Sequence, residues 1–275
     1  MEPGVTDTTP PVVVCIGGSD SGAGAGIQTD LKTLSALGVY ATTVVTAVTA
    51  QNTVGVNRVH AVPVDVIAAQ LDAVAGDFKP AALKTGFLGS AQAVETILQG
   101  ITRWDIPIRV VDPVMVSSAG HMIVDDETRD AYMRLLQVAT LGTPNFREAS
   151  LLTGISITDE RALIDAAAQL ARMCGTPTLV TGGHLMRSDV VDVLATPGGA
   201  TVFRQDRIDT RHVHGTGCSL ASAIAANCVT GSSLEDAIAS AREFVRRAIA
   251  SAATWELGAG QGPIDHFGWS AQDTS

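Results

Sequence analysis

A short glycine-rich turn in the last third of the chain has the composition of an anion-binding site. It reads His214-Gly-Thr-Gly-Cys-Ser-Leu220 and opens a run of small residues that predicts a helix. The first N–H groups of a helix have no partner within it, and the helix dipole adds about half a positive charge at that end. Charge develops on the oxygens of a phosphoryl group in transfer. The turn formed by Gly215, Thr216, Gly217 and Cys218 therefore predicts phosphoryl-transfer chemistry.

Cys218 lies in the first turn of this predicted helix. A thiol at such a position can have its pKa lowered from about 8.5 to roughly 4–7.5, which would make it a base or a reactive group. The alternative is a small buried hydrophobic residue, the usual environment of a free cysteine. Leu220, Ile224 and Cys228 share one helical stripe, so we expect Cys228 to face the core and to be structural.

A second glycine-rich segment, from Gly17 to Gly26, follows the apolar run Val12–Ile16. Its glycines do not have the spacing G-x-G-x-x-G of a dinucleotide-binding turn, and the chain has no P-loop motif. A loop of this kind is weak evidence by itself. Its alternative interpretation is a flexible turn with nothing bound.

Strands and helices alternate along most of the chain, which predicts an α/β fold with a parallel sheet. The expected strands are Val12–Ile16, Thr42–Val48, Ala82–Thr85, Ile108–Val111, Thr178–Thr181, Val190–Ala195 and Ala200–Arg204. The expected helices are Ile27–Leu37, Val64–Ala75, Ala91–Arg103, Glu160–Cys174 and two long helices at the end of the chain. Ligands of such sheets bind at the carboxyl ends of the strands. We therefore expect the site at the loops after Ile16, Thr85, Val111, Thr143 and Thr181.

The composition is that of a folded, acidic protein. Hydrophobic residues make up 46% and charged residues 17% of the 275 positions, which supplies an extensive core and argues against disorder. The formal net charge of -10 argues against a nucleic-acid partner, because such proteins carry a basic face. An acidic enzyme that binds phosphate groups must supply positive potential locally, from helix N-termini, backbone N–H groups and a metal.

The cysteines and the chain ends indicate the compartment and the domain organisation. The four cysteines lie far apart with no Cys-x-x-Cys pair, which fits a reducing compartment and predicts no zinc site. The first residues lack the pattern of a secretory signal, and no apolar run is long enough for a bilayer. We expect a cytoplasmic protein without a membrane partner. We also expect one domain over residues 11–270, with flexible tails at 1–10 and 271–275.

Several further motifs carry a family resemblance. They are Gly17-Gly-Ser-Asp, Gly24-Ala-Gly-Ile-Gln-Thr-Asp-Leu-Lys-Thr, Ala50-Gln-Asn-Thr-Val-Gly, Asp112-Pro-Val-Met, Thr143-Pro-Asn-Phe-Arg-Glu-Ala and Gly182-Gly-His. With the turn at His214 they make the chain resemble, from Val12 to Phe267, the hydroxymethylpyrimidine and phosphomethylpyrimidine kinases of the ribokinase-like superfamily. The resemblance implies a three-layer α/β/α sandwich with a mostly parallel central sheet, ATP and Mg²⁺ as cofactors, and a homodimer. The implied activity phosphorylates 4-amino-5-hydroxymethyl-2-methylpyrimidine to its monophosphate and then to the pyrophosphate, in thiamine biosynthesis.

The resemblance also implies roles for individual residues. Cys218, where wider relatives carry an aspartate base, is the implied catalytic residue, and the anion hole is formed by Gly215, Thr216 and Gly217. The implied substrate-binding residues are Gly18, Asp30, Gln51, Phe87 and Val114. The implied nucleotide-binding residues are Asn145, Thr181, Gly183 and His184. The implied metal ligands are Glu148 and, in second place, Asp112, since magnesium needs only one or two carboxylates.

Some of these positions have plain structural alternatives. Asp30 would otherwise be an exposed helix carboxylate beside Lys32 or in solvent, and Gln51 an ordinary surface residue. Phe87 would otherwise belong to the core, and Asp112 would cap a turn.

The chain also departs from the family pattern at two places. Many relatives have lysines where this chain has Ser117-Ser118 and Thr181. The positive charge would then come from magnesium, the helix N-terminus, Arg147 or His184.

Two rival functions are consistent with the sequence. A pyridoxal or pyridoxine kinase is the first rival, and a non-catalytic pyrimidine-binding regulatory protein is the second.

Overall fold

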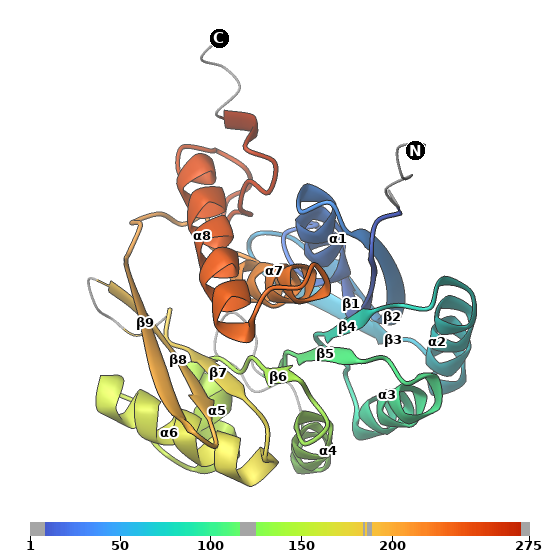
Figure 1. The fold of residues 1–275 in the computed structure, drawn as a ribbon. Helices are drawn as coiled ribbons and strands as arrows, with labels where there is room; N and C mark the ends of the chain where they lie inside the picture. The colour runs from blue at the N-terminus through green and yellow to red at the C-terminus, as the bar shows by residue number, and fades with distance from the viewer. Residues whose placement is uncertain (1–8, 116–124, 184, 186–188, 271–275) are drawn as a thin grey trace, which may run out of the picture.

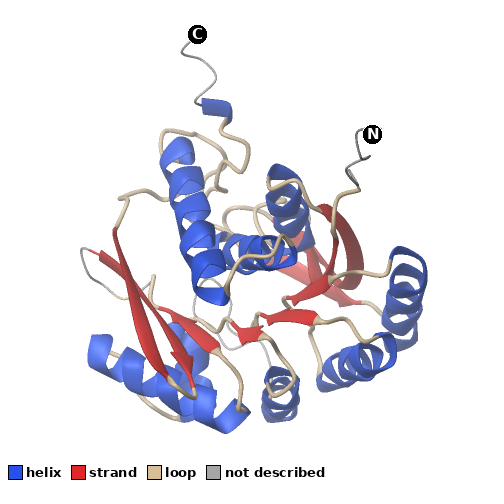
Figure 2. Ribbon diagram, viewed as in Figure 1, coloured by secondary structure: helices blue, strands red, loops and turns tan. Residues whose placement is uncertain are grey.

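The fold is built on one nine-stranded sheet, in a computed structural model that describes residues 9–115, 125–183, 185 and 189–270 (Figures 1 and 2). The strand order is β3-β2-β1-β4-β5-β6-β7-β8-β9. The strands are β1 (Val12–Asp20), β2 (Tyr40–Gln51), β3 (Val56–Ala61), β4 (Ala82–Thr85), β5 (Ile108–Val111), β6 (Leu141–Gly142), β7 (Thr178–Thr181), β8 (Asp189–Thr196) and β9 (Gly199–Asp206). Most of the predicted tails and the residues His184, Ser117 and Ser118 lie outside the described residues.

The pairing of the strands confirms a mostly parallel sheet. Strands β2, β1, β4, β5, β6 and β7 are parallel to one another, whereas β3, β8 and β9 pair antiparallel at the two edges. The central parallel strands are largely buried, because helices cover both of their faces. Strand order reverses between β1 and β4, and a ligand crevice opens at such a reversal, outside the carboxyl ends of the strands.

Helices cover both faces of the sheet, which confirms the three-layer prediction. Helices α1, α7 and α8 lie on one face, and α2 to α6 lie on the other (Figure 1). Their bounds are α1 (Gly26–Ala36), α2 (Val64–Phe78), α3 (Ala91–Trp104), α4 (Asp126–Leu136), α5 (Phe146–Thr153), α6 (Glu160–Cys174), α7 (Thr216–Val229) and α8 (Leu234–Ala252). None of these helices combines the length and the apolarity that a membrane span requires.

Several predicted elements are confirmed to the residue, and two predictions need correction. Strands β4, β5 and β7 and helix α6 have the expected bounds. Strand β1 does not end at Ile16 but continues to Asp20, because Gly17 and Gly18 stay paired with β2 across a register shift. The sequence prediction missed β3, whose six residues are all exposed and therefore show no buried, alternating pattern.

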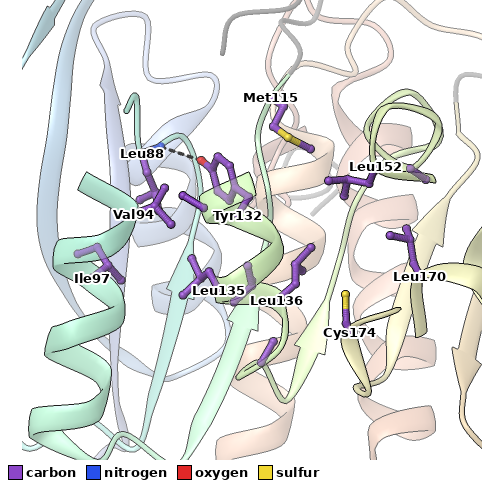
Figure 3. Packing of buried hydrophobic residues seen from close by; sticks show 14 of the residues in the cluster. Leu88, Val94, Ile97, Met115, Tyr132, Leu135, Leu136, Leu152, Leu170 and Cys174 are labelled. Atoms are coloured by element: carbon purple, nitrogen blue, oxygen red, sulfur yellow. Dashed lines mark hydrogen bonds between the residues drawn. The ribbon is translucent and has the colours of Figure 1, made fainter. Parts of the chain in front are cut away.

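Tyr132 anchors the loop that follows β4. Its side chain is completely buried, and Figure 3 shows it beside Leu88 in the core between α3 and α4. The Leu88 N–H donates to the Tyr132 hydroxyl at 3.1 Å, and that hydroxyl donates to the Gly86 carbonyl at 3.1 Å. One phenol group therefore satisfies two backbone groups on either side of Phe87.

We expect Tyr132→Phe to lower the free energy of unfolding by about 1–3 kcal/mol, because a buried N–H and a carbonyl lose their partner. Urea unfolding measures the change. The control is Tyr40→Phe, because the Tyr40 ring is half exposed and stacks on Phe78. The control should change stability by less than about 0.5 kcal/mol. Equal effects of the two substitutions would contradict the anchoring role.

Candidate functional site

A cavity of 790 Å³ opens at the carboxyl ends of the parallel strands. Its walls include residues that follow β1, β4, β5, β6 and β7, together with the first turn of α7, so a cavity lies at the loops where the sequence predicts the site. All the predicted site residues that the structure describes line this cavity. They are Gly18, Asp30, Gln51, Phe87, Asp112, Val114, Asn145, Glu148, Thr181, Gly183, Gly215, Thr216, Gly217 and Cys218. His184 lies outside the described residues, and the roles of the others stay predictions.

The first turn of α7 presents backbone N–H groups to the cavity. The helix begins after Gly215, which has φ +82° and, as a glycine, has no side chain that could cap the helix. The Thr216 hydroxyl turns back to the Val213 carbonyl at 3.0 Å instead of capping the helix. Within the described residues the N–H groups of Gly217 and Cys218 have no acceptor. They are therefore available to an anion, as the sequence predicts.

The two glycine-rich segments touch each other. A Cβ atom on Gly215 would lie 2.0 Å from the carbonyl oxygen of Gly24, and a Cβ atom on Gly24 would lie 2.5 Å from Cδ2 of His214. Both distances are far below van der Waals contact. Glycine at these positions therefore permits a backbone approach that joins the end of β1 to the start of α7.

Asp20 fixes the first glycine-rich segment. Its carboxylate accepts hydrogen bonds from the N–H groups of Gly22, Gly24 and Ala25 at 2.8, 3.0 and 2.9 Å, and His214 Nε2 lies 3.3 Å away. Burial alone would raise the pKa of Asp20, but these hydrogen bonds hold it below its usual value. The segment is therefore an ordered turn rather than a flexible one, and the binding of a ligand there stays a prediction. The sequence prediction missed this role, although Asp20 ends the motif Gly17-Gly-Ser-Asp.

Gln51 extends from the end of β2 into the same cavity. Its Oε1 accepts a hydrogen bond from the Thr49 hydroxyl at 3.2 Å, and its Nε2 lies 3.2 Å from Nε2 of His214. The side chain is partly buried, so it is not an ordinary surface residue. Its amide edge is held in a defined orientation at the wall of the cavity.

Lys84 is a functional candidate that the sequence prediction missed. It lies on β4 with no exposed surface, and its Nζ is 2.8 Å from Oδ1 of Asp30. Burial alone would lower the pKa of Lys84, but Asp30, Cys218 and Asp112 raise it above its usual value, so the ammonium stays protonated. The alternative of an exposed Asp30 beside Lys32 is wrong, because Asp30 is buried and paired with Lys84. Lys32 instead donates to the Ala23 carbonyl at 2.7 Å. A lysine in a short apolar strand was the available signal, since a buried cation needs a partner.

The predicted lowering of the Cys218 pKa is wrong. The pKa of the thiol is raised to about 11: burial is the largest cause and Asp30 and Asp112 also raise the pKa, whereas Lys84 and the Gly26 N–H lower it. Desolvation and two carboxylates outweigh the favourable charges, because both disfavour a thiolate. Cys218 is therefore a neutral thiol at neutral pH. Cys228 packs against the buried core between the sheet and helices α1, α7 and α8, as expected.

The two predicted metal ligands have different surroundings. Glu148 accepts hydrogen bonds from the N–H groups of Met115 at 3.2 Å and Asn145 at 2.9 Å, and it forms a capping box with Asn145. Asp112 is buried, its pKa is raised to about 6 by burial, and its side chain has no hydrogen-bond partner among the described residues. Asp112 therefore does not cap a turn with its side chain. Of the two, it has the open carboxylate.

The surroundings of Asp112 fit a magnesium ion that also binds phosphates. Thr143 lies at the end of the neighbouring strand, donates its N–H to the Val111 carbonyl at 2.9 Å and has a buried hydroxyl without a partner in the described structure. No cluster of three His, Cys, Asp or Glu side chains that could hold a metal occurs in the described residues. Magnesium does not need one, because it keeps water and takes phosphate oxygens.

The sheet, the cavity at its carboxyl edge and the open N-terminus of α7 together define a ribokinase-like small-molecule kinase. A family model described as phosphomethylpyrimidine kinase matches residues 20–265. The chain belongs to this family.

Individual relatives agree with the family match. A hydroxymethylpyrimidine/phosphomethylpyrimidine kinase of Streptomyces coelicolor is 45% identical over 263 residues, which cover 95% of this chain and 96% of the relative. The crystal structure of phosphomethylpyrimidine kinase from Clostridium difficile is 33% identical with a TM-score of 0.77, and the match covers 87% of this chain and 99% of that one. The ADP complex of Bacillus subtilis pyridoxal kinase is 32% identical with a TM-score of 0.88, covering 97% and 100%.

We expect Gly215→Ala to destabilise the protein by roughly 2–4 kcal/mol, because the new methyl group would meet the Gly24 carbonyl at a positive φ. Gly217→Ala is the matched control, since no atom lies within 4 Å of its new Cβ. The control should change stability by less than about 1 kcal/mol. Thermal unfolding of both variants measures the difference, and a stable Gly215→Ala would show that the two turns are not in close contact.

His266 supports α7 from the C-terminal segment. Its Nε2 lies 3.0 Å from the buried Ser219 hydroxyl. The pKa of His266 is lowered from 6.5 to about 4: burial is the largest cause and Lys32 also lowers the pKa, whereas Asp265 raises it. Between pH 6.5 and about pH 4 this histidine is protonated in the unfolded chain but neutral in the folded chain. The free energy of unfolding therefore falls as the pH falls.

The wild type should lose free energy of unfolding between pH 7 and pH 4.5 as His266 resists protonation in the folded state. We expect this loss to be smaller in His266→Gln by about 1–3 kcal/mol, because glutamine does not titrate. Urea unfolding at both pH values measures this difference. The control His60→Gln, at an exposed position of β3, should follow the wild type. A stability difference between His266→Gln and the wild type that does not vary with pH would contradict the burial of a neutral histidine.

Proposed function

We propose that this kinase phosphorylates 4-amino-5-hydroxymethyl-2-methylpyrimidine with ATP and then phosphorylates the monophosphate to the pyrophosphate, in thiamine biosynthesis. One observation carries the proposal. The open N–H groups at the start of α7 and the amide of Gln51 face the same cavity. The Streptomyces coelicolor relative, which is named for both reactions, supports this choice of substrate.

The substrate alcohol would occupy the part of the cavity between β1, β2 and the loop after β4. Gln51 offers an amide donor and an acceptor, which match the edge of an aminopyrimidine. Phe87 offers an apolar ring surface, and Val114 lines the same cavity. A Cβ on Gly18 would lie 3.4 Å from Cδ1 of Phe87, so glycine leaves room beside that ring. These contacts favour a flat heterocycle.

The nucleotide would occupy the part of the cavity between α7, α8 and the loops after β6 and β7. Apolar side chains of Leu220, Val245 and Ile249 line this part and suit an adenine ring. Asn145, Thr181 and Gly183 would lie along the phosphates, as predicted. The guanidinium of Arg147, stacked on the Phe146 ring at 5.1 Å, lines the cavity beside Asn145 and can supply the charge of the absent family lysine.

Asp112 and the hydroxyl of Thr143 would hold the magnesium ion. When bound, the metal neutralises charge on the phosphate oxygens. Glu148 would act through Asn145, because its capping box holds the start of α5 at the cavity wall. The preference for Glu148 over Asp112 as a ligand is therefore reversed in our proposal.

Cys218 would relay a proton rather than act as a thiolate base. The substrate oxygen forms a bond to the γ-phosphorus while the bond to the β,γ-bridging oxygen breaks. As the substrate hydroxyl loses its proton to the sulfur, the thiol passes its own proton to a phosphate oxygen. The N–H groups of Gly217 and Cys218 stabilise the transferring phosphoryl group. A neutral thiol, as the raised pKa implies, is the protonation state that this relay needs.

Phosphorylation of pyridoxal is the strongest alternative. The Bacillus subtilis pyridoxal kinase has the same fold, but its identity of 32% is lower than the 45% of the Streptomyces coelicolor protein. A regulatory protein that only binds the pyrimidine would not need an open anion site beside a magnesium site. The homodimer and the cytoplasmic location stay predictions.

Product analysis by mass spectrometry with Mg²⁺, ATP and the hydroxymethylpyrimidine tests the function. We expect two successive additions of one phosphate. Cys218→Ala should lower kcat by about 10²–10⁴-fold, because a proton-transfer group is lost. Cys228→Ala is the control on the same helix, and it should retain activity because Cys228 lies outside the cavity.

Parallel assays decide between the alternatives. A strong preference for pyridoxal over the pyrimidine would overturn the choice of substrate and leave the kinase chemistry intact. Tight binding of the pyrimidine without ATP consumption at high protein concentration would favour the regulatory protein. An active Cys218→Ala would remove the thiol from the mechanism.

A further inference from the structure

A buried cation lies beneath the cavity floor. Lys84 has no exposed surface, although it borders the cavity, and its Nζ lies 2.8 Å from Oδ1 of Asp30. A Cβ on Gly86 would lie 3.3 Å from the same Nζ, so the chain after β4 passes close to the ammonium. Burial of such a charge costs free energy that one hydrophobic residue would avoid. The pair therefore calls for a reason beyond stability.

The pair is connected to the catalytic helix. The Ser222 hydroxyl donates a hydrogen bond to the same Oδ1 of Asp30 at 2.8 Å, and Ser222 lies one helical turn after Cys218 on α7. Three elements, β4, α1 and α7, thus meet at one carboxylate oxygen. The other oxygen, Oδ2, is buried without a partner in the described residues. This arrangement sets the position of α7 through charged hydrogen bonds rather than through packing alone.

The same ammonium acts electrostatically on the thiol, and both side chains line the cavity. The charged groups that act on Cys218 are Lys84 from β4, Asp30 from α1 and Asp112 after β5. Lys84 is the only cation among them, and it also attracts Asp112. Buried Cys15, beside Lys84 in the sheet, is a further titratable neighbour of the thiol. One fixed positive charge therefore offsets two carboxylates below the reacting groups.

We propose that Lys84 is a positioning residue for phosphoryl transfer, which holds α7 through Asp30 and Ser222 and supplies the fixed positive charge under Cys218 and Asp112. The proposal rests on the proposed kinase function for its effect on turnover. Its effect on the thiol does not depend on that function. The two can therefore fail separately.

Two substitutions in one ion pair separate this role from a merely structural one. Lys84→Met and Asp30→Asn both break the pair, so a structural role predicts the same kind of damage from each. An electrostatic role predicts opposite effects on Cys218, because Lys84 favours the thiolate and Asp30 disfavours it. The sign of the change is the deciding result.

Alkylation of Cys218 by iodoacetamide, followed by mass spectrometry of its peptide from pH 7 to pH 9.5, measures the thiolate fraction. We expect Lys84→Met to slow alkylation about tenfold, which corresponds to a rise of about one pKa unit, and Asp30→Asn to accelerate it. In the kinase assay Lys84→Met should lower kcat about tenfold, because α7 loses the ion pair that holds its position. The KM for the pyrimidine should stay nearly unchanged, because Lys84 is not expected to contact the substrate.

Two further variants complete the test. The double variant Asp30→Asn with Lys84→Met removes both charges, and it should react more slowly than the wild type but faster than Lys84→Met. It replaces the single variant if Lys84→Met does not fold. The control pair, Asp192→Asn with Arg242→Met, removes a second buried ion pair whose groups do not act on Cys218. Its alkylation profile should match that of the wild type.

Changes of equal sign in Lys84→Met and Asp30→Asn, or no change in either, would overturn the proposal. A tenfold rise in KM with an unchanged kcat would overturn it too, because it would place Lys84 in substrate binding. The two proposals can also be separated. If the wild-type chain forms no phosphorylated product, but Lys84→Met and Asp30→Asn change the alkylation rate of Cys218 in opposite directions, the proposed function is refuted and the electrostatic role of Lys84 is retained.

Discussion

The site depends on the close approach of two backbone turns that lie nearly 200 residues apart in the chain. Gly24 and Gly215 touch through main-chain atoms, at a distance that no side chain tolerates. This contact places the N-terminus of α7 over the end of β1, where the strand order of the sheet reverses. Asp20 holds one turn by three hydrogen bonds to backbone N–H groups, and in the other turn the N–H groups of Gly217 and Cys218 have no acceptor among the described residues. The proposed binding of phosphate would thus be a consequence of how the chain packs.

The electrostatics of the cavity follow from burial more than from net charge. The chain carries a formal charge of -10, and the positive potential at the site comes from helix amides and from Lys84, which is neutralised in part by Asp30. Desolvation raises the pKa of Asp112 to about 6 and that of Cys218 to about 11, so at neutral pH the thiol is neutral whereas the carboxyl group of Asp112 is mostly ionised. A bound cation would favour the ionised form of Asp112. The thiol, in contrast, gains nothing from being charged beside an incoming phosphate.

The alternation of strands and helices follows local rules and predicted the parallel α/β sheet, whereas the three layers and most of the candidate site residues came from the family resemblance, and those that the structure describes line one cavity. The strand Ala82–Thr85 is a short buried run with Gly86 after it, and parallel strands bring their following loops to one edge. The exposed strand β3 carries no burial pattern, so periodicity did not predict it. The pair of Lys84 with Asp30 joins residues 54 positions apart, and no local rule connects them. The Cys218 pKa depends on desolvation by the whole fold, which the position at a helix N-terminus does not report.

A thiol at position 218 fits a cavity that already contains acidic groups. Asp30 and Asp112 both act on this position, and a third carboxylate there would have to ionise against their charge as well as against burial. It would also repel the phosphate oxygens that the N–H groups of α7 attract. A neutral thiol occupies the same place without adding negative charge, and it can still exchange a proton. The replacement of the aspartate that wider relatives carry is therefore consistent with the two acidic residues that remain, one tied to Lys84 and one open to a metal.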